Sequence, residues 1–197
     1  MSKISAVDIK RLWYIEPAGY LSSIFSTNQA LDAAAMARIV SSIDVSSIFH
    51  EVENVHQDTW TFEEAEGSQE FYTNQLTGKK YRAGRRTEGD TTVKFTIGQY
   101  DYETKKAILG GTLLTTGDGA SQEVVGWAKA GTAENVCRGI VFKTDDEQFC
   151  FIPWCSFTAN EANADKAVGL AVTATEMEPA VSEKWSSEVW YDGTLNA

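Results

Sequence analysis

Hydrophobic and polar residues alternate with a period of two in several segments from about residue 48 onward. Trp60 and Phe62 alternate with threonine and glutamate, and the same pattern runs through residues 92–97 and 170–175. This period is typical of a β-strand that buries one face and exposes the other. We therefore predict a strand in each of these places, packed on a hydrophobic core.

Two further segments, residues 138–143 and 148–157, contain more apolar residues than simple alternation would place there. The polar sequence 144–147 separates them and suits a turn. The pattern predicts a β-hairpin whose strands are more buried than the others. The polar segments 116–120 and 160–165 are expected to be loops.

A helix is expected near the N-terminus, over about residues 27–41. Ser26 suits the N-cap, and Gln29 follows at the capping-box position. Apolar residues then recur with helical spacing, at Leu31, Ala34, Ala35 and Ile39. The alanines would let this helix lie close to a neighbouring surface.

A second, shorter helix is expected inside the β region, over about residues 101–110. Asp101 is a good N-cap, and Gly110 and Gly111 tolerate the positive φ of a helix stop. A helix between β segments indicates a mostly β fold of the α+β class. We expect a β-sandwich or half-open barrel of antiparallel strands, with this short flanking helix and an additional N-terminal helix.

The length of 197 residues favours a single domain. Within it we distinguish an N-terminal helical extension (1–47), a β core (48–178) and a C-terminal tail (179–197). The tail is polar but rich in aromatic residues, which suggests that it docks on a surface. Its aromatic residues are Trp185, Trp190 and Tyr191.

Composition argues against two classes of protein. With 28 acidic and 17 basic residues the chain has a formal charge of −11, which disfavours duplex DNA binding because phosphates would be repelled. Six Trp, seven Tyr and nine Phe are too many for an intrinsically disordered chain. The acidity itself needs another explanation.

The sequence shows no pattern typical of secretion or membrane insertion. Asp8, Lys10 and Arg11 interrupt the first apolar residues, so we expect no secretory signal, and no run approaches the ~20 apolar residues of a membrane span. Synthesis inside the cell is favoured, with a mature protein whose signal was removed as the alternative. The cysteines are expected to be reduced, apolar residues; they are Cys137, Cys150 and Cys155.

No arrangement of residues points to catalysis. The two histidines, His50 and His56, would lie ~20 Å apart along one strand, too far to share a metal ion. No serine or cysteine stands in a context typical of a catalytic nucleophile, and no phosphate-binding or calcium-binding loop is complete. We expect no enzyme activity, no metal and no cofactor.

One short stretch departs from the acidic character of the chain. Five of the 17 basic residues fall between Lys79 and Arg86. One interpretation is a solvated hairpin tip, and the other is a loop that contacts an acidic surface of a second copy. The candidate contact residues are Lys79, Lys80, Tyr81, Arg82, Arg85 and Arg86.

Residues 86–111 contain, in order, Gly-Asp, an alternating strand, Tyr-Asp, a short helix and Gly-Gly. This order resembles the tail tube proteins of long-tailed bacteriophages. The later order of hairpin (138–157), polar loop and alternating strand ending at Met177-Glu178-Pro179 is similar too. The polar segment from about 63 to 90 resembles the extended loop that contacts the adjoining ring in such tubes. The resemblance covers about residues 50–178.

The resemblance implies a non-enzymatic structural protein. Six copies would join their sheets edge to edge into a hexameric ring, and rings would stack into a tube that conducts DNA and contacts other tail proteins. Such a protein is made in the bacterial host cytoplasm and resides in the virion tail. Six copies at −11 each would carry −66 per ring, so DNA would slide without adhering, and the basic stretch would hold neighbouring rings together.

Two other functions stay open on the residues alone. A hydrolase would need an ordered pocket that holds His50 or His56 near a nucleophile. A β-sandwich binding module would bind carbohydrate or a partner protein through exposed tryptophans, with candidates Trp127, Trp154, Trp185 and Trp190.

Overall fold

The computed structural model describes residues 8–118, 121–164 and 166–196. The strands are β1 (Ile9–Ile15), β2 (Phe49–Glu51), β3 (Thr61–Glu64), β4 (Ser68–Thr73), β5 (Lys80–Thr87), β6 (Thr91–Ile97), β7 (Thr112–Thr116), β8 (Glu123–Ala128), β9 (Val136–Thr144), β10 (Gln148–Ala164), β11 (Ala167–Glu176) and β12 (Val189–Asp192). The α-helices are α1 (Ala33–Ser42) and α2 (Tyr102–Leu109), and the short 3₁₀ helices are η1 (Pro17–Leu21) and η3 (Gly193–Asn196).

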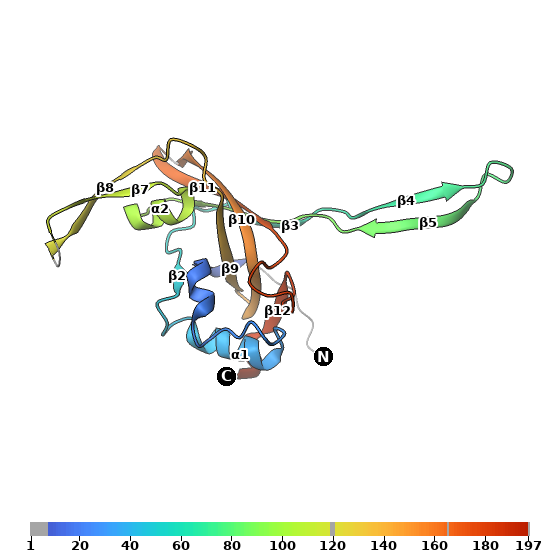
Figure 1. Cartoon of the computed structure of the whole chain (residues 1–197), viewed down its shortest axis with the longest axis horizontal. Coiled ribbons are helices and arrows are strands. Elements are labelled where there is room, and N and C mark those ends of the chain that lie inside the picture. Colours follow the sequence, from blue (N-terminus) through green and yellow to red (C-terminus); the bar gives the residue numbers. More distant parts are fainter. Residues whose placement is uncertain (1–7, 119–120, 165, 197) are drawn as a thin grey trace.

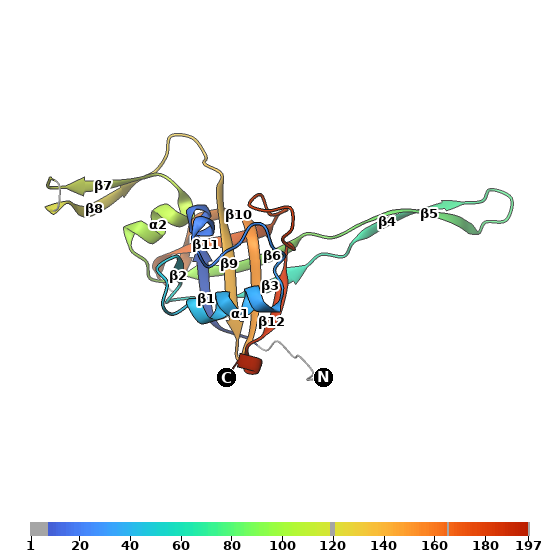
Figure 2. The ribbon, with the colours of Figure 1, turned by 60° about the horizontal axis from the view of Figure 1, so that its bottom comes forward.

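Eight strands form the main antiparallel sheet, in the order β2-β1-β9-β10-β11-β6-β3, with β12 added to β10. The first half of β10 pairs with β9 and β12, and its second half pairs with β11. Two separate hairpins, β4–β5 and β7–β8, project from opposite sides of the body (Figures 1 and 2). The expected fold class is confirmed: the protein is mostly β, antiparallel and sandwich-like, with two α-helices.

The sheet curls, so that strands far apart in its order face each other across an inner core. Phe142 of β9 lies four strands from β3, yet its ring centre is only 5.6 Å from that of Phe62. The rings of Trp60 and Trp190 also contact the Phe142 ring, nearly edge to face, with ring centres 4.9 and 5.5 Å from its centre. Edge-to-face contacts of this kind favour a defined ring geometry. This aromatic group therefore fixes the curvature of the sheet.

The central strands β1 and β9 and the first half of β10 are buried on both faces over most of their length. In β9, Ile140 and Phe142 point to the inner core, whereas Val141 points to an outer hydrophobic cluster. Consecutive residues are therefore all removed from water, which explains why these strands lack simple alternation. The predicted hairpin is confirmed, with residues 145–147 connecting β9 and β10.

The outer cluster is covered by α1, η1 and the C-terminal tail. Trp185 is buried there, with its ring centre 5.3 Å from Tyr20 and 5.8 Å from Phe25. The tail then continues into β12, which pairs with β10. The surface on which the aromatic tail docks is thus the chain's own sheet.

A β-bulge in β10 fastens η1 to the sheet. Pro153 and Trp154 together oppose Gly139 of β9, and the Tyr20 hydroxyl donates a hydrogen bond to the carbonyl of Pro153. A Cβ on Gly139 would overlap that hydroxyl. Position 139 therefore requires glycine because the tyrosine crosses directly over it.

The N-terminal helix is shorter than the sequence predicts. It begins at residue 33 and not at about 27, because Asp32 and not Ser26 is the N-cap: the Asp32 carboxylate accepts a hydrogen bond of 2.8 Å from the Ala35 N–H. Ahead of the helix, the backbone carbonyls of Ser26, Thr27 and Asn28 accept hydrogen bonds from side chains of the C-terminal tail. Contacts with the tail therefore hold this segment in turns.

The main sheet also includes residues from segments that the sequence predicts to lie outside strands. Within residues 1–47, which the sequence predicts as a helical extension, β1 forms an inner strand between β2 and β9. The expected loop at 160–165 is strand as far as Ala164, because pairing with β11 continues through this polar stretch, and Asp165 lies outside the described residues. Of the expected loop at 116–120, Thr116 is instead the last residue of β7, Gly117 and Asp118 follow the strand, and residues 119 and 120 lie outside the described residues.

Replacing Phe142 with alanine should lower the free energy of unfolding by about 3–5 kcal/mol, since three aromatic partners lose the ring they share. Chemical denaturation followed by circular dichroism measures this change. Leu76→Ala is the matched control, because that side chain is 94% exposed and its loss should change stability by no more than about 0.5 kcal/mol. Equal effects of the two variants would contradict the role given to Phe142.

Candidate functional site

The basic residues singled out in the sequence lie on an arm that projects far from the body. We name residues 67–87 the basic arm; it consists of β4, β5 and the turn between them (Figures 1 and 2). Its residues are exposed along the whole length, apart from half-buried Asn74 and Gly84. The arm is thus a ribbon with both faces open to solvent.

The candidate contact residues form a strand and not the expected loop. Lys79 lies just before β5, and the others lie within β5, which pairs with β4 from Ser68–Thr87 to Thr73–Lys80. Neither face of the ribbon is buried, so no alternation of apolar residues marks it in the sequence. The residues expected at a solvated hairpin tip thus run along one strand of a solvent-exposed hairpin, from the turn to the root.

Cations and aromatic rings are held together on the basic arm. The Lys80 Nζ lies 3.8 Å from the centre of the Phe71 ring, and the Arg82 guanidinium lies 5.5 Å from that of Tyr72. A ring face orients a cation without neutralising its charge. Tyr81, 68% exposed, adds a further aromatic group. The arm therefore presents both apolar and positively charged surface to a partner.

Charge on the basic arm is opposite to that of the body. Five basic residues and Glu70 give the arm a formal charge of +4, which leaves −15 on the rest of the chain. Within the described residues, no ion pair neutralises any of the five basic side chains. The positive field of the arm is therefore available to a neighbouring molecule.

The root of the basic arm is held by the main sheet. Lys94 of β6 forms an ion pair with Glu63 of β3 at 2.9 Å, and the Ala65 N–H donates to the Asp90 carbonyl at 3.0 Å. Gly89 lies so close to Ala65 that a Cβ would overlap the alanine carbonyl. The arm consequently leaves the body as an extension of the β3–β6 pairing.

The three residues expected to bound the short helix do so. The Asp101 carboxylate accepts a hydrogen bond of 2.6 Å from the Thr104 N–H, and this bond lowers the pKa of Asp101. Gly110 and Gly111 follow α2 with φ of 73° and 88°. The N-cap and the glycine stop predicted from the sequence are both confirmed.

The two glycines also position a second arm, in a region where the sequence pattern predicts only a loop. We name residues 112–128 the acidic arm; it consists of β7, β8 and their connection. At its root, the Trp127 indole N–H donates to the Gly110 carbonyl at 2.7 Å, and the Gly111 N–H donates to the Glu134 carboxylate at 3.0 Å. The signal in the sequence was a pair of β-branched segments flanking Gly117-Asp118.

The acidic arm differs from the basic arm in charge but shares its apolar exposure. Asp118 and Glu123 are its charged residues, and it contains no lysine or arginine. Three aliphatic side chains on it are exposed, at Leu114, Val124 and Val125. The molecule thus has two projecting ribbons of opposite charge.

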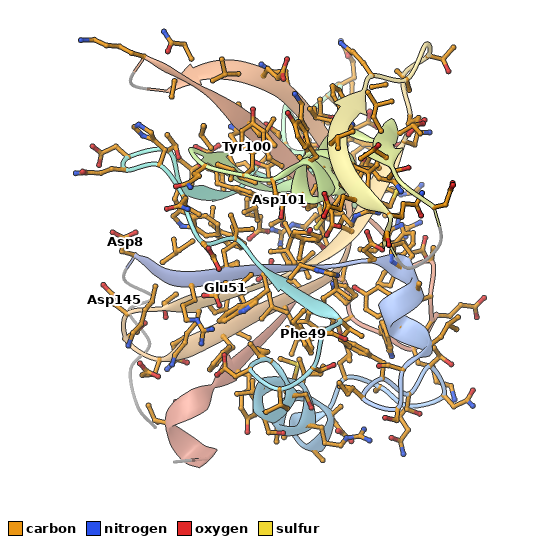
Figure 3. The ribbon with its side chains drawn as sticks, turned by 90° about the vertical axis from the view of Figure 1, so that its left-hand side faces the viewer. Asp8, Phe49, Glu51, Tyr100, Asp101 and Asp145 are labelled. Atoms are coloured by element: carbon orange, nitrogen blue, oxygen red, sulfur yellow. The ribbon has the colours of Figure 1, made fainter. Side chains whose placement is uncertain are left out.

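A hollow of about 560 Å³ lies between β2 and the start of α2. Figure 3 shows β2, with Phe49 and Glu51, passing between Asp101 and helix α1. The His50 ring stacks on Tyr14 with ring centres 4.9 Å apart, and both residues line the hollow. The residues described as its lining include no serine or cysteine.

The second histidine and the cysteines lie elsewhere. The Nδ1 atom of His56 lies 3.0 Å from the carbonyl of Gln57. All three cysteines are free, as predicted; Cys150 and Cys155 are buried, and burial raises the pKa of both thiols. Among the described residues, no three His, Cys, Asp or Glu side chains are grouped as a metal ion requires, and no described helix is long and apolar enough to span a membrane.

The tryptophans proposed for a binding module are not exposed. Trp185 is buried in the outer cluster, and Trp190 contacts Phe142 in the inner core. Trp127 is half-buried at the root of the acidic arm, and Trp154 is half-buried beside Tyr20. The expectation of exposed tryptophans was wrong because each ring packs within its own chain.

Comparison with known proteins gives no family. No protein-family model matches the chain, and no curated protein matches its sequence.

Replacing Asp101 with alanine should lower the free energy of unfolding by about 1 kcal/mol, because the Thr104 N–H loses its acceptor. Asp101→Asn should retain most of this stability. Since folding lowers the pKa of Asp101, the carboxylate's contribution is present at neutral pH and is lost as the pH falls through the folded-state pKa, below its ordinary value of 3.8. Urea unfolding at pH 7 and pH 3 measures both effects, with exposed Asp118→Ala as the unaffected control.

Cys150 and Cys155 should resist thiol reagents in the folded protein at pH 8. Their raised pKa keeps both as neutral thiols, whereas the thiolate is the reactive form. Mass spectrometry after labelling, with and without denaturant, counts the modified positions. Rapid labelling of both cysteines in the native protein would show that the sheet centre is open to solvent.

Proposed function

We propose that the protein is a non-catalytic structural subunit that assembles with copies of itself into hexameric rings, which stack into a phage tail tube that conducts DNA. The observation that carries the proposal is the basic arm: a long, exposed ribbon with five cations unpaired among the described residues and with aromatic side chains in water. An isolated two-stranded ribbon is marginally stable in water, so an arm of this kind is suited to a partner surface.

The charge distribution supports self-association over binding to nucleic acid. The arm carries +4 and the rest of the chain carries −15, so the nearest complementary surface for the arm is another copy of the same protein. A ring of such bodies would present an acidic wall to DNA, which would pass without adhering. In this proposal the protein is made in the host bacterium, becomes part of the virion tail and meets other tail proteins there.

A carbohydrate-binding module is the weaker alternative. Such a module needs aromatic rings exposed on a platform, and the four candidate tryptophans are buried or half-buried. The exposed aromatic residues Phe71, Tyr72 and Tyr81 instead share a ribbon with five basic residues. That combination favours an acidic protein surface as the partner.

Concentrated wild-type protein should form rings or tubes in negative-stain electron microscopy and masses well above the 21.7 kDa of one chain in light scattering. A shortened variant should fold but lose this assembly. Ser68 and Thr87 are paired, so a two-residue Asn-Gly turn can replace residues 69–86 without disturbing the root.

The shortened variant should keep its unfolding midpoint, because the deleted residues are exposed or half-exposed ones outside the body of the protein. Circular dichroism supplies this control. A wild-type protein that stays monomeric at every concentration would overturn the proposal, and so would a shortened variant that assembles as well as the wild type.

A further inference from the structure

We infer that the basic arm of one copy docks on the acidic arm of a second copy, in a head-to-tail contact. This inference rests on the proposed self-assembly and names the two surfaces that meet.

Exposed apolar side chains are concentrated on the arms. Of the twelve large hydrophobic residues that are exposed in the described parts of the chain, seven lie on these two ribbons. The other five are scattered singly over the body, as is ordinary for a protein surface. The seven are Phe71, Tyr72, Leu76 and Tyr81 on the basic arm, and Leu114, Val124 and Val125 on the acidic arm.

The charges of the two arms are complementary. The basic arm carries +4, and Asp118 and Glu123 give the acidic arm −2. Many parts of the acidic body would attract the basic arm, but among the described elements only the acidic arm combines negative charge with three exposed aliphatic residues on one pair of strands. Apolar contact between the ribbons, bordered by opposite charges, would remove both exposed patches from water.

The size and direction of the arms suit this contact. Strands of five to eight residues give each ribbon a length of roughly 17–27 Å, so the two can lie along each other. The arms leave the body on opposite sides, and Figures 1 and 2 agree on this, so the arms of one molecule do not meet each other. A contact between different surfaces is heterologous, and repetition of it builds rings or stacked arrays rather than isolated dimers.

Charge reversal on each arm tests the inference. The basic-arm variant carries Arg82→Glu, Arg85→Glu and Arg86→Glu, and the acidic-arm variant carries Asp118→Arg and Glu123→Arg. Each variant alone has arms of like charge and should assemble at least about tenfold less well than the wild type, as expected for the loss of several exposed charge pairs. In a mixture, every contact between the two different variants joins arms of opposite charge, so the mixture should assemble again.

Sedimentation velocity and electron microscopy measure assembly, and circular dichroism verifies that each variant is folded. A control variant carries Arg38→Glu, Lys106→Glu and Lys166→Glu, which reverse three exposed charges of the body and should leave assembly within about twofold of the wild type. High salt should also weaken assembly of the wild type, because salt screens the attraction between exposed charges.

The outcomes separate the two proposals. If the wild type does not assemble, the proposed function fails. If the wild type assembles but either arm variant assembles equally well, or the mixture behaves no better than its components, the proposed function stands and the contact between the arms is wrong.

Discussion

Backbone pairing along β10 is the interaction on which the rest of the structure depends. This strand pairs with β9, β12 and β11 in turn, so it joins the doubly buried centre of the sheet to the half that carries β6 and the basic arm. The bulge at Pro153 lets one strand serve both halves, because it turns β10 while the Tyr20 hydroxyl satisfies the freed carbonyl. Without this strand the inner core would be exposed on one side, and the sheet that holds the roots of the two arms would be divided.

Anchoring at the roots explains how two exposed ribbons can point in defined directions. The basic arm begins at the Lys94–Glu63 ion pair of an edge strand, and the acidic arm begins where Trp127 closes on Gly110. Each root lies within or against the packed body, whereas each tip is solvent-exposed or half-exposed over most of its length. Direction is thus set by the sheet and by α2, and the arms themselves are free to present side chains selected for contact and not for folding.

Sequence patterns predicted several elements that bury one face, such as β6 and α2, but they missed the exposed ribbons and also β1, an inner strand within the predicted helical extension. Val93, Phe95 and Ile97 alternate because one face of β6 packs on the inner core, and Asp101 and Gly110 bound α2 because helix ends need defined residues. The ribbons β4–β5 and β7–β8 have no buried face that would impose a period. The first was indicated only by the cluster of charge between Lys79 and Arg86 and by the long polar segment around it. The start of α1 depends on contacts with the C-terminal tail, and such long-range contacts leave no local pattern.

The length of the basic arm follows from the charge of the body in the proposed assembly. With +4 on the basic arm and −2 on the acidic arm, the total of −11 leaves −13 on each body, so two bodies repel one another, and at physiological salt this repulsion decays over about 8 Å. The eight residues of β5 span roughly 26 Å, so contacts near the end of the arm are made several screening lengths away from its own body. A short basic loop would bring the acidic surfaces together along with it. A long ribbon places the attractive contact away from the body, so that the body can stay strongly acidic while the arm supplies the attraction between copies.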